Sequence, residues 1–353
     1  MIYESHLWSD DLDIVVNKIG NDVLEKLSEK TVLITGASGL ICSTLADVLI
    51  RFNETKNGNI KIVAASRSEE NIIKRFGHYS KRDYFRFVSY DATKSIANIG
   101  FPVDFIIHGA GNAFPDLVSK QPVETMQGNI LGLIGLLEYA KDNNVNRLLY
   151  ISSSEIYGRI DNHGSYKEGD YGYIDILNVR NSYSVGKRAS ETMCISFSEE
   201  YDMDAVIVRP GHIYGPTASV NDNRVSSQWP YAVSRGNDII MKSNGEQLRS
   251  YCYCLDCASA ILTVLLKGKK REAYNISNSN TVISIREMAE ILASSAGVKI
   301  KMEIPSERER RIFNPMSNSS LDNTKLVDLG WEGCFSHTEG LSHTVQILKD
   351  IMK

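Results

Sequence analysis

The clearest chemical signal in this 353-residue chain is the stretch YSVGK (Tyr183–Lys187), which places a tyrosine and a lysine four residues apart. Within a helix, that spacing puts both side chains on one face. A neighbouring ammonium group favours the phenolate and lowers the phenol pKa, so the tyrosine can remove a proton near neutral pH. A serine at a strand end, within YISSSEIYG (Tyr150–Gly158), can supply a second hydrogen bond to the reacting hydroxyl. The pair also occurs by chance on solvated helices, so its meaning depends on the motifs around it.

A glycine-containing turn, TGASGLICST, lies about 150 residues upstream, after one apolar run and before another. Gly36 allows a tight turn, and Gly39 lets the backbone approach a pyrophosphate at the positive end of the following helix. A third small residue normally governs the packing of helix on strand, and here that position holds Cys42. Cysteine is small and tolerates burial, so we interpret Cys42 as a packing variant; the alternative is a weakened cofactor site.

The elements that must position these groups follow from a repeated pattern of apolar run, turn and helical segment. The apolar runs are continuous and rich in β-branched residues, which is typical of parallel strands covered on both faces. The alternation predicts an α/β fold with a doubly wound, mostly parallel sheet. Strands are expected at 31–35, 60–65, 85–90, 105–108, 147–152 and 205–209, and helices at 40–52, 125–143, 182–201 and 285–296.

Three parts of the chain are distinguished by their patterns. Residues 1–30 are expected to form a helical extension that packs on the core, capped by Ser9 or Asp10. Residues 31–210 are expected to form the dinucleotide-binding domain, to which 248–268 return. Residues 211–353 are expected to form mainly a smaller mixed α/β cap that binds substrate. The apolar positions of the extension are Ile14, Val15, Ile19, Val23, Leu24 and Leu27.

Composition narrows the function classes. The chain is 42% hydrophobic and 23% charged, with a formal net charge of −4, so we expect no nucleic-acid partner. No apolar run reaches the roughly 18 residues of a membrane span and no signal pattern is present, so we expect a cytoplasmic protein without membrane contact. Cys252 and Cys254 are expected to alternate along a strand and Cys257 to begin a helix, without zinc-ligand spacing. We therefore expect core cysteines and no metal.

Taken together, these motifs resemble the extended short-chain dehydrogenase/reductase family, the NAD-dependent epimerases, dehydratases and decarboxylases of nucleotide sugars. The resemblance runs from about residue 31 to 277 and implies a Rossmann sheet, oxidation of the sugar C4 hydroxyl through a 4-keto intermediate, and a tightly bound, recycled NAD or NADP. It also implies a homodimer formed through helices 125–141 and 182–201, and a role in bacterial surface polysaccharide synthesis. The motifs are TGASGLI, FIIHGAG, GNILGLIGLLEYA, RNSYSVGKRASETM, RPGHIYGP and GEQLRSYCYCLDCASAI.

The resemblance assigns site residues position by position. Tyr183 would be the catalytic base, Lys187 its partner on the nicotinamide ribose, and Ser153 the active-site serine, with Ser154 and Glu155 as the pair that separates subfamilies. The cofactor-binding residues would also include Gly36, Ser38, Gly39, Leu40, Ile41, Ser66, Arg67, Asp91, Ala92, His108, Gly109, Ala110 and Pro210. The substrate-binding residues would be Asn112, Asn129, His212, Arg224 and Arg249, the last gripping the diphosphate.

The reaction is narrowed by Ser154 and Glu155, a pair similar to that of UDP-glucuronate decarboxylases and GDP-mannose-type dehydratases. The dTDP-glucose-type dehydratases carry Asp-Glu there, and galactose 4-epimerases usually lack a carboxylate. Glu155 could also be a purely structural, hydrogen-bonded carboxylate. The alternatives are a 4-epimerase, a 4-ketoreductase, or a non-catalytic dinucleotide sensor or scaffold, although such relatives typically lose the tyrosine or lysine.

Several positions depart from the family pattern. His212 stands where many relatives have asparagine. Ser66 and Arg67 replace the aspartate that binds the ribose hydroxyls of NAD, so they could accommodate the 2′-phosphate of NADP, or Arg67 could simply be exposed. The run SERERR (306–311) is expected to be either a solvated face or a loop near the diphosphate. The sequence does not identify a second cation for the carboxylate of a decarboxylase substrate.

Overall fold

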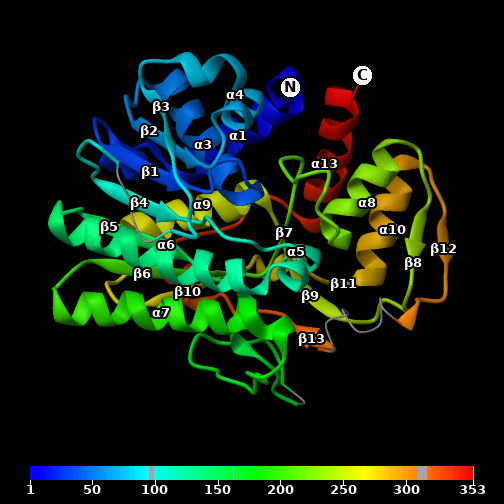
Figure 1. The fold of residues 1–353 in the computed structure, drawn as a ribbon. Coiled ribbons are helices and arrows are strands. Elements are labelled where there is room, and N and C mark those ends of the chain that lie inside the picture. The colour runs from blue at the N-terminus through cyan, green and yellow to red at the C-terminus, as the bar shows by residue number, and fades with distance from the viewer. Residues whose placement is uncertain (95–98, 162, 308–315, 353) are drawn as a thin grey trace.

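A seven-stranded, wholly parallel sheet with the order β10-β6-β5-β4-β1-β2-β3 lies at the centre of the fold (Figure 1). The structure is a computed structural model that describes residues 1–94, 99–161, 163–307 and 316–352. The strands are β1 (Thr31–Thr35), β2 (Lys61–Ser66), β3 (Phe85–Ser89), β4 (Phe105–His108), β5 (Arg147–Ile151), β6 (Ala205–Pro210) and β10 (Ala273–Ile276). The predicted fold class is confirmed.

Both faces of this sheet are buried because neighbouring strand residues point in opposite directions. Val32 and Ile34 of β1 enter one hydrophobic core, and Leu33 enters the other. Helices α3 (Leu40–Lys56), α4 (Glu69–Phe76) and α9 (Cys254–Lys267) cover the first face. Helices α6 (Pro122–Asp142) and α7 (Ser182–Glu200) cover the second.

The N-terminal extension adds an outer layer over α3 and α9 (Figure 1), and its last residue, Lys30, accepts a 2.9 Å hydrogen bond from the amide of Lys61 on β2. Its helix α1 (His6–Ile19) begins after Ser5, so the expected cap at Ser9 or Asp10 is wrong, and Ile14 is exposed. The short helix α2 (Asn21–Leu24) follows. The buried carboxylate of Asp11 accepts a 2.9 Å hydrogen bond from Tyr253 Oη and contacts His343 Nδ1 on α13 (His337–Met352).

The C-terminal part contains a second, smaller sheet centred on β9 (Leu248–Tyr253). Strand β11 (Val282–Ser284) pairs antiparallel with it, whereas β7 (His212–Tyr214) and β13 (Asn318–Ser319) pair parallel. A two-stranded sheet joins β8 (Ile239–Met241) to β12 (Ile300–Met302). The helices of this part and the remaining short ones are α5 (Pro115–Lys120), α8 (Val225–Ser234), α10 (Ile285–Ala296) and α12 (Thr324–Val327).

The junction between the two parts corrects one expectation. Strand β9 ends at Tyr253 and α9 begins at Cys254, so Cys254 lies on the helix rather than on the strand. The expected helix start at Cys257 is therefore three residues too late. All three cysteines of this stretch are buried free thiols. Among the described residues, no group of three potential ligands is arranged for a metal ion, and no helix has the length and apolarity needed to cross a bilayer.

Candidate active site

The predicted site residues gather at the carboxyl ends of β1, β4 and β5. The strand order reverses between β1 and β4, and ligands of open α/β sheets bind at such a switch point. Gly36 directly follows β1 and Gly109 directly follows β4, while Ser153 stands two residues beyond β5. The sheet topology therefore brings the glycine turn and the active-site serine to the same edge.

The glycine turn has the geometry of a phosphate cradle. Gly36 has φ +70°, and a Cβ there would lie 2.9 Å from both the Ala110 nitrogen and the Gly109 oxygen. Ser38 and Gly39 are exposed, while Leu40 and Ile41, at the start of α3, are partly buried. Since α3 is a 17-residue helix, its first N–H groups and its dipole face outward at this turn.

Cys42 fills space that Gly109 leaves open. A Cβ built on Gly109 would lie 2.4 Å from the Cys42 sulfur, so a side chain at one position excludes the present side chain at the other. Burial raises the pKa of the Cys42 thiol to about 12, which keeps it neutral. This contact of α3 with the end of β4 supports the packing interpretation of Cys42.

Lys187 projects from α7 into the core below the turn that follows β5. Its Nζ donates a 2.7 Å hydrogen bond to the Ile151 carbonyl and lies 4.7 Å from the centroid of the Tyr150 ring. Nζ is 5.8 Å from the centroid of the Tyr183 ring. Burial lowers the pKa of Lys187 to about 8, and the carboxylate of Glu191 is the strongest opposing influence.

Ser153 lies beside Tyr183, as the predicted roles require. Burial raises the pKa of Tyr183 to about 12, while the neighbouring Ser153 hydroxyl and the charge of Arg224 oppose that rise. Lys187 was expected to lower this pKa directly, but in this structure its ammonium group is directed to the Ile151 carbonyl. The cation acting on Tyr183 here is Arg224.

Glu155 lies in a 3-10 helix (Ser154–Tyr157) beside the first turn of α7. It is exposed, and its carboxylate accepts a 3.3 Å hydrogen bond from Ser184 Oγ. Ser153 caps this helix by accepting a bond from the Glu155 amide. Glu155 is thus held next to Tyr183 yet remains open to solvent, as a carboxylate that meets substrate must be.

The opposite end of the cofactor region lies at β2 and β3. Ser66 is buried at the end of β2, Arg67 is exposed, and Asp91 accepts hydrogen bonds from Thr93 that lower the Asp91 pKa. The charge of Arg67 acts on Asp91 in the same direction, so these two side chains are neighbours. Ala92 is buried beside them.

The buried polar atoms without a partner in the described structure include His108 Nε2, at the end of β4, and Asn129 Oδ1 on α6. His108 Nδ1 is 2.7 Å from Thr35 Oγ1, and burial lowers the pKa of His108 to about 3, so the ring is neutral. Unpartnered buried polar groups call for a ligand or water. With the Gly36 cradle and the helix N-terminus, these donors and acceptors fit a dinucleotide.

The predicted substrate residues lie toward the second sheet. Arg249 is 3% exposed and donates to the carbonyls of Leu248 and Met316; within the described part of the chain no carboxylate pairs with it. His212 has a buried, unpartnered Nδ1, and burial together with Arg249 and Arg224 lowers its pKa to about 3. A buried cation without an anion is costly, which suits Arg249 to an anionic ligand.

The remaining predicted positions are close to this group. Arg224 is paired with Asp222 and lies over the Phe114 ring. Asn112 and Asn129 both approach Thr125 on α6, the first at 3.5 Å from its hydroxyl. Pro210 ends β6. Most of the SERERR run, residues 308–311, lies outside the described residues.

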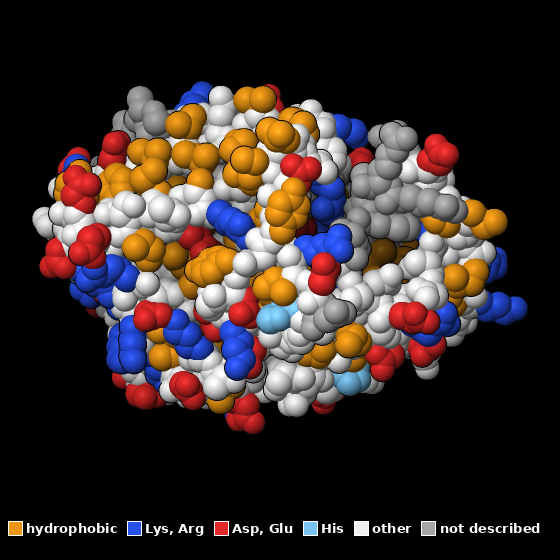
Figure 2. Space-filling model, turned by 90° about the horizontal axis from the view of Figure 1, so that it is seen from below, with side chains coloured by type: hydrophobic (Ala, Val, Ile, Leu, Met, Phe, Trp, Pro, Cys, Tyr) orange, Lys and Arg blue, Asp and Glu red, His pale blue; other side chains and the backbone are white. Residues whose placement is uncertain are grey.

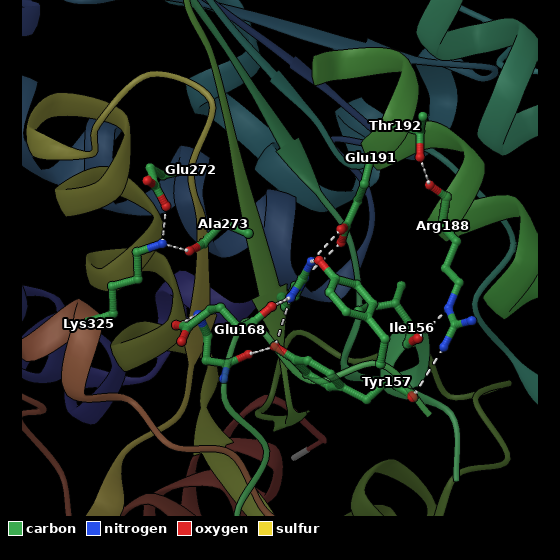
Figure 3. A network of polar contacts seen from close by, with 12 residues as sticks. Ile156, Tyr157, Glu168, Arg188, Glu191, Thr192, Glu272, Ala273 and Lys325 are labelled. Carbon is green, nitrogen blue, oxygen red and sulfur yellow. Dashed lines mark hydrogen bonds and ion pairs between the residues drawn. The ribbon is translucent and has the colours of Figure 1, made fainter. Parts of the chain in front are cut away.

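Sequence reasoning missed several polar groups. Gln247 Oε1 and Ser319 Oγ, which flank Arg249, are buried without a partner. Glu191 and Arg209 form a buried ion pair between α7 and β6, in the network of polar contacts drawn in Figure 3. The spacing of Glu191, four residues after Lys187, was the one available signal.

Known proteins resemble this chain over most of its length. A profile of the NAD dependent epimerase/dehydratase family matches residues 32–277. UDP-glucuronic acid decarboxylase 3 of Arabidopsis thaliana is 29% identical over 317 residues, covering 88% of this chain and 86% of the relative.

Solved structures with the same fold include a UDP-glucose 4-epimerase from Thermotoga maritima, with a TM-score of 0.77 at 21% identity, covering 92% of this chain and 100% of that one. A dTDP-glucose 4,6-dehydratase from Streptomyces venezuelae, solved with NAD bound, has a TM-score of 0.77 at 23% identity and covers 91% of this chain and 97% of that one. At these identities the structural likenesses bear on the fold alone.

Proposed function

The chain belongs to the NAD dependent epimerase/dehydratase family, and from its active-site residues we propose that it is a decarboxylase of a nucleotide-linked uronic acid. Membership confirms the family resemblance of the sequence motifs and makes the chain an enzyme of that family. The observation that carries the proposal is the placement of Glu155, which accepts a 3.3 Å hydrogen bond from Ser184, the residue after Tyr183. The Glu155 amide donates to Ser153, and Arg224 lies beside this group.

The residues of the site have the following proposed roles in the first step, the oxidation of the sugar C4 hydroxyl. Tyr183, as phenolate, takes the proton of the sugar C4 hydroxyl, and Ser153 holds that hydroxyl by a hydrogen bond. Lys187, whose Nζ lies 5.8 Å from the centroid of the Tyr183 ring, is proposed to add positive charge to that of Arg224. A bound nicotinamide supplies the reversible two-electron oxidation of the sugar carbon. Gly36, Gly39 and the start of α3 would hold its pyrophosphate, with His108 Nε2 and Asn129 Oδ1 as polar partners near the switch point.

A keto group at C4 is β to the C6 carboxylate of a uronic acid, so the carbon–carbon bond can break with its electrons moving toward the keto oxygen. Arg224 is the cation proposed to bind that carboxylate, because its charge already acts on both Tyr183 and Glu155. Arg249 is proposed to bind the diphosphate, which would supply the anion it lacks among the described residues.

The choice of dinucleotide rests on Ser66 and Arg67. We propose that the enzyme accepts NADP as well as NAD, because no carboxylate ends β2 to repel a 2′-phosphate and the exposed Arg67 offers it a cation. The acidic Glu69 and Glu70 at the start of α4 oppose phosphate binding there, so discrimination is expected to be modest.

A homodimer built on α6 and α7 is part of the proposal. On the face viewed in Figure 2, which looks from below onto the side of α7, hydrophobic side chains gather at the surface. Ile130, Leu131, Ile134, Val185 and Ile195 of these helices are at least partly exposed and belong to neither hydrophobic core. Sedimentation of Ile134→Lys tests this: a dimer that becomes a monomer supports it, and an unchanged mass contradicts it.

Mass spectrometry of products tests the reaction. The purified enzyme is incubated with UDP-, dTDP-, GDP- and CDP-linked sugars and uronic acids, with NAD or NADP, alongside the Tyr183→Phe variant. Loss of carbon dioxide from a uronic acid is expected. Loss of water would instead establish a dehydratase, an isomer of unchanged mass an epimerase, and a gain of two hydrogens a reductase. If neither dinucleotide binds, the enzyme proposal fails. We further propose that the product serves surface polysaccharide synthesis, a role implied by the family resemblance.

A further inference from the structure

The catalytic face of α7 carries a third ionisable residue. Tyr183, Lys187 and Glu191 follow one another at intervals of four, so they occupy successive turns of one face. Glu191 is 8% exposed and forms a two-point ion pair with Arg209 of β6, with Nε–Oε1 3.0 Å and Nη2–Oε2 2.7 Å. Such paired contacts fix both distance and orientation.

Arg209 carries this constraint from α7 to the turn after β5. Its Nη1 donates to Tyr157 Oη at 3.1 Å and to the Glu168 carbonyl at 2.7 Å (Figure 3). Tyr157 is the last residue of the 3-10 helix that follows Ser153, and its hydroxyl in turn donates to Asn275 on β10. Arg209 thus has a carboxylate on one side and the active-site turn on the other.

A second arginine fastens the same turn from outside. Arg188 donates from Nε to the Ile156 carbonyl at 2.6 Å and from Nη2 to the Tyr157 carbonyl at 3.2 Å (Figure 3). Arg188 and Glu191 lie on α7, so the helix holds the turn through its backbone and through Tyr157. The positions of Ser153 and Tyr183 relative to one another depend on both attachments.

Glu191 also supplies charge. Lys187 is buried, which disfavours its ammonium form, and the nearest carboxylate along its helix face is that of Glu191. The Glu191 charge raises the Lys187 pKa against the effect of burial.

We propose that Glu191 is a positioning residue of this active site, which fixes α7, and with it Lys187, against the Ser153–Tyr157 turn through Arg209. The inference deepens the proposed function, since it takes the roles of Tyr183 and Lys187 from it. Glu191 is not expected to touch substrate.

The test is a direct titration of Lys187 that needs no substrate. Proteins labelled with ¹³C and ¹⁵N at lysine are followed by NMR from pH 6 to 11, with the Lys187 signal assigned by its loss in Lys187→Arg. Glu191→Gln is expected to lower the Lys187 midpoint by about one pH unit or more, because a buried charge of opposite sign is lost. Glu191→Asp keeps the carboxylate but shortens the side chain by one methylene, so it is expected to lower the Lys187 midpoint by less.

A matched ion pair distinguishes this role from simple stabilisation. Arg147 and Asp204 form a similar two-point pair at the other end of β5 and β6, with N–O distances of 2.9 Å and 2.7 Å. Asp204→Asn is expected to lower thermal stability but leave the Lys187 midpoint in place. An unchanged midpoint in folded Glu191→Gln overturns the proposal, as does an equal shift in Asp204→Asn.

Two further results complete the test. If Glu191→Gln does not fold, Glu191→Asp decides, and an unmoved midpoint there overturns the proposal. Because the titration is independent of turnover, an enzyme that converts no uronic acid would refute the proposed reaction without altering this result.

Discussion

Lys187 Nζ donates a 2.7 Å hydrogen bond to the carbonyl of Ile151, the last residue of β5. Ser153 follows two residues later, so this bond ties the helix that carries Tyr183 to the strand end that presents Ser153. The ammonium group proposed to act in catalysis therefore also ties together the two elements that carry the residues proposed to hold the sugar hydroxyl.

Replacing Tyr183 by phenylalanine removes the proton acceptor but keeps the ring. Turnover is expected to fall by about 10²- to 10⁴-fold, the usual contribution of a general base, while dinucleotide affinity changes little. Steady-state kinetics and calorimetric titration with dinucleotide measure the two effects. Tyr173→Phe, in the exposed loop before α7, is the matched control and should behave as wild type. A Tyr183→Phe variant with most of its activity would exclude this residue as the base.

The free energy of unfolding between pH 8 and 10 is expected to depend on the lowered pKa of Lys187. Its pKa is about 8 in the folded protein, against about 10.4 for an unperturbed lysine. Below pH 8 the folded state bears the full cost of a buried charge. Between about pH 8 and 10.4 the unfolded state binds more protons than the folded state, so this residue makes the free energy of unfolding rise with pH. Turnover is expected to fall over the same range, because it needs the ammonium form of Lys187. Urea unfolding of wild type and Lys187→Met across this range should show the rise only in wild type; parallel curves would contradict the assignment.

The fit between Cys42 and Gly109 predicts a non-additive pair of substitutions. Gly109→Ala alone should destabilise the protein by about 1–3 kcal/mol, because the new Cβ overlaps the Cys42 sulfur. In a Cys42→Ala background that cost should shrink, since the sulfur is gone. Chemical unfolding of the four proteins of this double-mutant cycle measures the coupling. Equal costs in both backgrounds would show that the contact does not limit the packing.

Arg67 is expected to govern the preference between dinucleotides. A hydrogen-bonded contact with a charged group contributes about 1.5–3 kcal/mol, so Arg67→Ala should weaken NADP binding by roughly tenfold or more and leave NAD binding nearly unchanged. Calorimetric titration with each dinucleotide gives both affinities. Arg159→Ala, another exposed arginine, should alter neither. An unchanged NADP affinity in Arg67→Ala would remove the proposed 2′-phosphate contact.

The central sheet could be predicted from sequence because its strands are apolar over several consecutive residues. The expected ranges 31–35, 85–90 and 105–108 differ from β1, β3 and β4 by at most one residue. The short strands β7, β8 and β13 could not be predicted, since two or three residues carry no usable period. Strands β7 and β13 pair with β9, and β8 pairs with β12, so their register depends on where the tertiary structure places those partners.

Some residues of the candidate site could be predicted from sequence and others could not. Tyr183, Lys187 and Gly36 stand in local motifs, whereas the ion pair of Glu191 and Arg209 joins residues from two elements that meet only in the fold. The direction of the Lys187 ammonium group likewise depends on where β5 ends. Sequence spacing identifies which groups share a helix face, but not which backbone carbonyl will accept a hydrogen bond from them.

The direct passage of β9 into α9 limits how this enzyme can be re-engineered. Arg249 lies on β9, and five residues later the same chain enters the helix that covers the central sheet beside α3. A chimera that exchanged the part proposed to bind substrate for that of another nucleotide-sugar enzyme would also replace α9, and with it part of the core under the proposed dinucleotide site. New sugar specificity is therefore better sought by single substitutions around Arg249 than by exchange of whole modules.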